Sequence, residues 1–265
     1  MKNKLFCISY LMGLLLLSKT SFEVNAQKLP NKQQASIWAP ANIKIDGNAN
    51  EWDNKFQAYN HATDIYYTIS NDKENLYLTV MVDRGLITDK ILREGLSFSI
   101  NGTEVRKDAS KITITYPVLQ GADRNAVTGL FFVKMKKESD AKNADYSLES
   151  LNKLFESKAN SISVKGINSI GNEDISVYNE QGIKAVARFQ KPSNYVYELA
   201  VPLKYLKLTD GAEKTLNYLI KLNVTQGPTP VATIRYPDLL PPPPPARASV
   251  ATTDFSGEYI LAKAP

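Results

Sequence analysis

The segment from Leu76 to Val82 (LYLTVMV) constrains the fold more than any other part of the chain. In an extended strand its alternate side chains point to opposite faces, and both sets are mainly apolar or aromatic. Such a segment predicts a strand buried on both sides, at the centre of a sheet. A β-branched and aromatic segment at 65–69 precedes it across a polar connection, and the two together predict a hairpin.

Short β-segments recur along the rest of the chain, separated by turn residues. Further strands are predicted at 43–45, 96–100, 112–116, 130–135, 161–167, 183–189, 195–201, 216–224 and 258–261. Asn101-Gly102 predicts a tight hairpin turn, and Pro202 predicts the end of a strand. One helix is predicted at 146–158, with an apolar stripe and Ser147 as its cap. This pattern is typical of an all-β fold, an antiparallel β-sandwich with one short inserted helix.

The N-terminus has the order of features that marks a secretory signal. Lys2 and Lys4 precede an apolar run, and Val24-Asn25-Ala26 then offers small residues for cleavage. The run is shorter than the ~20 residues of a membrane-spanning helix. We therefore expect residues 1–26 to be a signal peptide and the protein to be exported, periplasmic or surface-associated, with no integral membrane segment after cleavage.

The remaining chain is predicted to form one domain. The expected organisation is a disordered leader at 27–36 and a single β-sandwich at 37–265, in which 136–160 form a charged insert with the helix and 237–246 a proline-rich loop. Five consecutive prolines in that loop predict a stiff polyproline II segment. It is interpreted as a rigid surface loop, with partner docking as the alternative.

Charge and cysteine content narrow the classes of function. Removing 1–26 takes away three lysines and one glutamate, so the net charge falls from +5 to +3. A charge this small gives no indication of nucleic acid as a partner. The only cysteine, Cys7, leaves with the signal peptide, which excludes cysteine–histidine metal sites and Cys–His catalysis in the mature chain.

Residues for other chemistry are few. His61 is the only histidine, and no serine stands in a nucleophile-elbow context, so no catalytic residues are assigned. Asp46 and Asp83 are weak candidates for calcium, because each is equally explained as a turn or strand-end residue. Aromatic side chains could stack on sugar rings. Trp38, near the mature N-terminus, is the freer tryptophan, and Trp52 is interpreted as a plug at one end of the sandwich.

Four motifs, in this order, resemble those of carbohydrate-binding module family 9 and its DOMON-like relatives. They are Ile43 to Trp52 (IKIDGNANEW), Asn75 to Asp83 (NLYLTVMVD), Tyr197 to Leu203 (YELAVPL) and Phe255 to Leu261 (FSGEYIL). The resemblance implies an exported β-sandwich that holds sugars between aromatic rings, with calcium supporting its loops. It assigns framework roles to Asp46, Gly47, Glu51, Trp52 and Asp83.

The departures from the family weaken the sugar site more than the fold. Where sugar-binding members carry an aromatic and then acidic residues, this chain reads Leu92 to Ile100 (LREGLSFSI). The second stacking aromatic falls near the proline run, with Tyr236 the nearest candidate. Some DOMON-like relatives bind haem, for which Met81 and His61 are the only pair of ligands here. Haem is therefore not expected.

The sequence thus predicts an exported, non-catalytic protein that binds carbohydrate or a related ligand, with Trp38 and Tyr236 as the ligand-binding candidates. The alternative is an interaction or assembly factor of the cell envelope, whose partner would be another protein.

Overall fold

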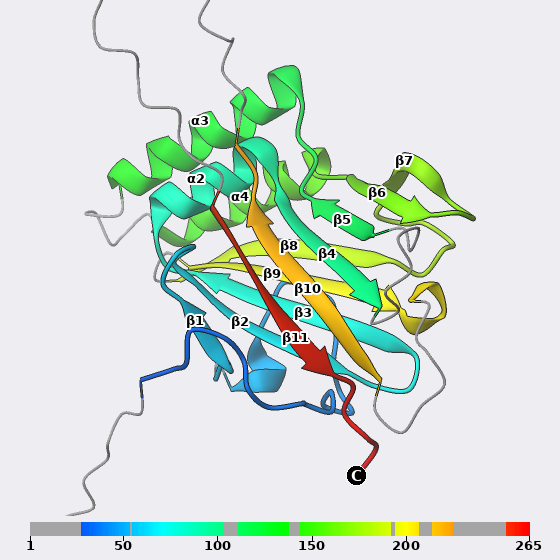
Figure 1. Ribbon diagram of the computed structural model, residues 1–265. Helices are drawn as coiled ribbons and strands as arrows, with labels where there is room; N and C mark the ends of the chain where they lie inside the picture. The colour runs from blue at the N-terminus through cyan, green and yellow to red at the C-terminus, as the bar shows by residue number, and fades with distance from the viewer. Residues whose placement is uncertain are drawn as a thin grey trace, which may run out of the picture.

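In the residues that the structure describes, the fold consists of two antiparallel β-sheets, of five and six strands, with three α-helices (Figure 1). The computed structural model describes residues 28–53, 55–102, 111–137, 144–191, 194–206, 214–224 and 253–265. The predicted signal peptide, Tyr236 and the proline-rich loop lie outside these residues. In the part of the chain that is described, no helix is both long and apolar enough to cross a membrane.

The five-stranded sheet has the order β1-β2-β3-β9-β8. Its strands are β1 (Ala58–Asn60), β2 (Ile65–Asn71), β3 (Asn75–Val82), β9 (Asn194–Pro202) and β8 (Lys184–Gln190). The predicted hairpin of β2 and β3 is confirmed, and β3 lies at the centre of the sheet, buried along most of its length. As predicted, β9 ends at Pro202, where the chain turns into the 3-10 helix η3 (Leu203–Tyr205).

The six-stranded sheet has the order β11-β10-β4-β5-β6-β7. Its strands are β11 (Thr253–Ile260), β10 (Thr215–Leu222), β4 (Leu96–Gly102), β5 (Ile112–Tyr116), β6 (Ser161–Ile167) and β7 (Gly171–Ser176). The hairpin signalled at Asn101-Gly102 is present, because β4 pairs antiparallel with β5, but the two residues themselves belong to β4 and pair with β10. An Asn-Gly pair can lie within a strand when the adjacent strand, here β10, provides its backbone hydrogen-bond partners.

The inner faces of the two sheets pack against each other, as in a β-sandwich. Tyr67 of β2 lies 5.0 Å, ring to ring, from Phe255 of β11, and its hydroxyl is 3.0 Å from that of Tyr218 on β10. Farther along, the Tyr116 and Tyr197 rings meet across the sheets at 6.1 Å. The core is therefore filled with aromatic side chains, which supply much of the buried apolar area.

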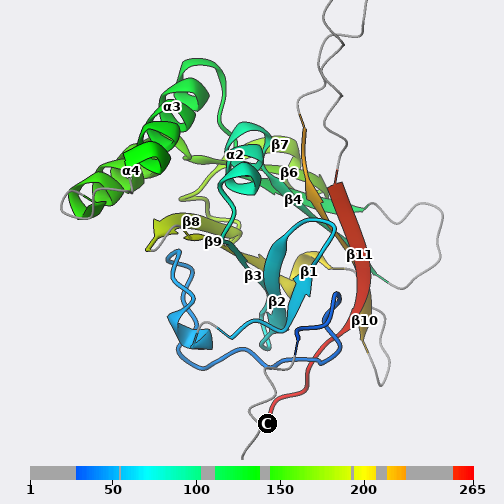
Figure 2. The same cartoon turned by 90° about the vertical axis from the view of Figure 1, so that its left-hand side faces the viewer.

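The helices gather at one end of the sandwich (Figures 1 and 2). They are α2 (Gly85–Glu94), α3 (Gly121–Lys137) and α4 (Ala144–Lys158). The predicted helix at 146–158 is confirmed as α4, but the expectation of a single helix is wrong. The strand predicted at 130–135 is also wrong, because those residues belong to α3, where Phe131 is buried and Phe132 and Val133 are exposed. A short apolar run alone does not distinguish a helix from a strand.

The N-terminal segment, residues 28–57, covers the outer face of the five-stranded sheet, and we call it the N-terminal layer. Apolar residues of this layer pack on side chains of β3 and β9 that point away from the sandwich core. The strand predicted at 43–45 is absent there, although Ile43 and Ile45 do pack against the sheet. Trp52, in the 3-10 helix η1 (Asn50–Trp52), lies on this outer face and not at an end of the sandwich.

Residues 28–36 form no helix or strand, yet they are held against the sheet. The Gln33 side chain accepts a hydrogen bond from Ile69 N and donates one to Ile69 O, both at 2.7 Å. Gln33 N also donates to the Tyr67 hydroxyl. The segment predicted to be a disordered leader thus supplies a partner to the backbone of β2 beyond the short β1.

Gly257 gives a direct test of the packing between β10 and β11. It lies opposite Tyr218, and a Cβ added there would meet the buried Tyr218 ring and hydroxyl. We expect Gly257→Ala to lower the free energy of unfolding by about 1–3 kcal/mol, because the ring would have to leave its position beside Tyr67. Urea denaturation measures this. Ser256→Ala, on the opposite face of the same strand, is the control, and equal effects of the two substitutions would contradict the packing.

Candidate functional site

The outer face of the six-stranded sheet is polar, and no helix or strand of the described residues covers it (Figures 1 and 2). Strand alternation causes this, because the residues between the buried apolar positions point outward. The register places these outward side chains in rows that cross the strands. The rows are Glu258, Asn217 and Asn101; then Ser256, Leu219, Ser99, Thr113 and Lys165; then Asp254, Lys221, Ser97, Thr115 and Ser163.

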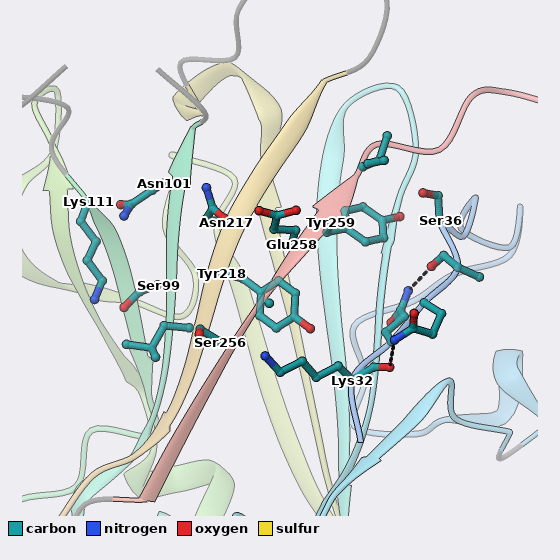
Figure 3. Close-up of a pocket in the computed structure, with 16 residues that line it drawn as sticks. Lys32, Ser36, Ser99, Asn101, Lys111, Asn217, Tyr218, Ser256, Glu258 and Tyr259 are labelled. Atoms are coloured by element: carbon teal, nitrogen blue, oxygen red, sulfur yellow. Dashed lines mark hydrogen bonds between the residues drawn. The ribbon is translucent and has the colours of Figure 1, made fainter. Parts of the chain in front are cut away.

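Two hollows of about 810 and 920 Å³ lie on this face. The first extends over β11, β10 and β4 to residues 32–36 of the N-terminal layer, and Figure 3 shows its lining. The second runs over β4, β5 and β6 to the ends of α2 and α3. Ser99, Lys111 and Leu219 line both hollows, so the two form one continuous depression, which we call the sheet groove.

Paired hydroxyl groups form the floor of the sheet groove. Ser97 Oγ lies 2.7 Å from Thr115 Oγ1, and Ser99 Oγ lies 2.9 Å from Thr113 Oγ1. Asn223 Nδ2 also donates to Ser97 Oγ at 2.8 Å. Each hydroxyl both donates and accepts hydrogen bonds, so the floor keeps capacity for a ligand rich in hydroxyl groups.

Exposed amides and charged groups stand above this floor. Asn101 and Asn217 are opposite each other and exposed, and Glu258 lies beside Asn217 on β11. At the helical end, Arg124 Nη1 binds Glu94 Oε1 at 3.0 Å, which holds one wall of the groove. The groove therefore presents donors and acceptors of several kinds at fixed positions on strands.

The structure does not bring the predicted ligand-binding aromatics into this groove. Trp38 is half-buried and forms a parallel bridge with Asn71 at the edge of the other sheet, outside the lining of both hollows. Tyr236 lies outside the described residues. The tyrosines that do line the groove, Tyr218 and Tyr259, lie at its β11 end (Figure 3).

Asp46, Gly47 and Glu51 cluster around Glu198 beneath the N-terminal layer, with Trp52 packed nearby on Val196, whereas Asp83 is exposed and lies apart. Glu198 of β9 is fully buried, and its Oε2 accepts hydrogen bonds from the backbone N–H groups of Asp46 and Gly47, both at 2.9 Å. Gly47 has φ +79°, and a Cβ there would meet Arg188. Asp46 Oδ1 accepts from Asn48 N and so shapes its own turn. The cluster holds the turn of the N-terminal layer on the sheet.

Glu198 is the residue of this cluster that the sequence reasoning did not single out. Burial raises the pKa of its carboxyl to about 8, against the lowering effect of the two backbone N–H groups, with further raising by the charges of Glu51 and Asp46. Glu198 Oε1 and Glu51 Oε2 are both buried, and neither has a hydrogen-bond partner among the described residues. The available signal was a carboxylate in the middle of an otherwise apolar strand, YELAVP.

The calcium and haem candidates are not assembled into sites. Asp46 contacts β9 at Glu198, which is opposite Thr79, whereas Asp83 is exposed past the end of β3, about 13 Å along the strand from Thr79. Within the described residues, no three His, Cys, Asp or Glu side chains are grouped to hold a metal ion.

The two candidate haem ligands also lie in different surroundings. Met81 packs under the N-terminal layer with Trp52 and Val196. His61 is exposed, and its ring meets the Tyr59 ring edge-on at 4.9 Å.

Comparison of the chain with protein-family models, with curated proteins and with solved structures finds no match.

Proposed function

We propose that this protein binds a saccharide in the sheet groove without catalysing a reaction. The observation that carries the proposal is the floor of paired hydroxyls, with amides above it, in a depression on a rigid sheet. Saccharides present many hydroxyl groups, which are both donors and acceptors and match such a surface. Because the side chains project from paired strands, they are held in position before the ligand arrives, which lowers the entropy cost of binding.

The resemblance to carbohydrate-binding modules supports the same class of ligand. Asp46, Gly47 and Glu51 of that resemblance lie around Glu198 on the five-stranded sheet, so they would maintain the fold, while the groove would bind the sugar. In this proposal the ligand is held by hydrogen bonds, because the two tyrosines of the lining, Tyr218 and Tyr259, are buried. The signal-like N-terminus supports export, which would place the groove where extracellular or periplasmic glycans are available.

Substitution of Asn101 and Asn217 tests the proposal. Both side chains are exposed, so Asn101→Ala combined with Asn217→Ala should leave the fold intact. We expect the double substitution to weaken binding of any saccharide found on a glycan array by about tenfold or more, because it removes several hydrogen bonds to the ligand. Calorimetric titration of the purified protein measures the change.

The matched control is Asn50→Ala, an exposed asparagine on the N-terminal layer, which should leave affinity unchanged. Saccharide binding that survives the double substitution would place the site elsewhere on the protein. A protein that binds no saccharide, but retains a protein of the cell envelope in a pull-down, would favour the alternative role as an interaction factor.

A further inference from the structure

We infer that the saccharide bound in the sheet groove is acidic, with its carboxylate or sulfate group held by Lys111 and Lys165; this inference rests on the proposed function. It follows from the distribution of charge across the six strands. The four central strands are β10, β4, β5 and β6, and Lys111 directly precedes β5. On these strands and at Lys111, the outward charged side chains are Lys221, Lys111 and Lys165. Of the carboxylates that line the groove, Asp254 and Glu258 lie on β11 and Asp174 on β7, and Glu94 of α2 is paired with Arg124.

Lys111 and Lys165 differ from Lys221 in their neighbours. Lys221 is directly opposite Asp254, whereas Asp174 is opposite Ser163 and is thus only a diagonal neighbour of Lys165. Lys165 is opposite Thr113, and Lys111 comes two residues before Thr113, so both lysines lie on the outward face of adjacent strands. Within the described residues, neither Lys111 nor Lys165 takes part in an ion pair. Two ammonium groups thus lie near each other with no described carboxylate between them.

The backbone places these two lysines close together. Diagonal neighbours on adjacent strands are about 7–8 Å apart, within reach of long side chains. Gly166, which follows Lys165, packs so closely on the Lys111 carbonyl group that a Cβ would not fit. The pairing of β6 with β7 is also irregular between Val164 and Ile167, and such a bulge redirects the side chains beside it.

An anion at this position would remove the repulsion between the two lysines. Like charges that face each other on a sheet are unfavourable, and an acidic group between them turns the repulsion into two charge-assisted contacts. Lys111 lines both hollows and extends along the lining near Ser99 (Figure 3). The acidic group would therefore sit at the centre of the groove, with the rest of the sugar over the hydroxyl floor on either side.

Titration with saccharides of different charge tests this inference. The probes are trigalacturonate, a sulfated chondroitin hexasaccharide and neutral galactotriose. We expect at least one acidic probe to bind about tenfold more tightly than the neutral one, and its affinity to fall with rising salt. Lys111→Gln combined with Lys165→Gln should abolish that preference. The control, Lys44→Gln combined with Lys184→Gln, removes the same charge from exposed positions outside the groove and should preserve it.

The outcomes separate the two proposals. Binding of trigalacturonate shows that a carboxylate suffices, and binding of the sulfated probe alone, which carries carboxylates as well, shows that a sulfate is needed. Equal affinity for acidic and neutral probes overturns the acidic ligand, and a preference that survives loss of both lysines overturns their role in holding it; either result leaves saccharide binding intact. Failure of all probes and of a wider glycan array overturns both proposals. Circular dichroism of each variant verifies that the fold is retained.

Discussion

Replacing Glu198 with alanine is expected to lower the free energy of unfolding by about 3 kcal/mol at about pH 4.5, where the carboxyl is neutral in the folded protein. The substitution leaves the buried N–H groups of Asp46 and Gly47 without an acceptor and opens a cavity on the outer face of β9. Glu198→Gln keeps a neutral acceptor of the same size, so we expect it to cost less than about 1 kcal/mol. Chemical denaturation of both variants measures the difference, and similar losses for the two would show that the acceptor does not matter.

The same residue predicts how stability depends on pH. Burial raises the pKa of the Glu198 carboxyl from 4.5 to about 8 in the folded protein, so the fold retains a proton that the unfolded chain releases. The stabilising contribution of the neutral carboxyl is complete below about pH 4.5 and is lost as pH rises to about 8, by up to about 4 kcal/mol. Glu198→Gln should remove this part of the decline. Parallel profiles for the two proteins between pH 4.5 and 9 would contradict it.

Replacing Asn71 with alanine is expected to destabilise the protein by about 3 kcal/mol and to loosen β11. Asn71 Oδ1 accepts hydrogen bonds from the Tyr259 hydroxyl at 2.9 Å and from Ala262 N at 2.7 Å, and its Nδ2 donates to Ala262 O. Its side chain is 2% exposed, so the loss leaves several buried groups unpaired. Tyr259 also binds both backbone groups of Ile37, so the N-terminal layer should loosen with β11.

Amide hydrogen exchange separates a local from a general effect of Asn71→Ala. We expect protection to fall most along β11 and residues 31–39, while the centre of the five-stranded sheet, β3 and β9, remains protected. Asn75→Ala is the matched control, because Asn75 lies in the same hairpin but makes a single side-chain hydrogen bond, to Tyr77. Uniform loss of protection across both sheets would contradict the expectation that Asn71 specifically joins β11 to the five-stranded sheet.

The strands that lie at the centre of a sheet were the most predictable part of the fold. Their sequences, such as LYLTVMV and YELAVPL, are apolar on both faces because each face is buried, one by the other sheet and one by the N-terminal layer. Helix α3 was not predictable in the same way. Phe131 is buried, whereas its neighbours Phe132 and Val133 are exposed, so the run carries no helical stripe that would distinguish it from a strand.

The candidate site was less predictable than the fold, for a reason of geometry. The sheet groove is assembled from small polar residues such as Ser99 and Thr113, which are ordinary on the outer face of any sheet. Only the pairing of β10 with β4, of β4 with β5 and of β5 with β6 brings these residues into rows. Aromatic side chains, the usual signal for a sugar site, do not mark this groove, and the segment of Trp38 instead extends the pairing of β2.

The contacts of the N-terminal layer also constrain the order in which the chain can complete its fold. Asp46 and Glu198 are 152 positions apart, and Ile37 and Tyr259 are 222 positions apart. Residues made first therefore find their partners only after nearly all of the protein has been synthesised. Until then the outer face of β3 and β9 has no cover. A topology with such high contact order folds slowly and exposes apolar surface to other chains while it does so, so the growing chain depends on protection from aggregation until its last strand arrives.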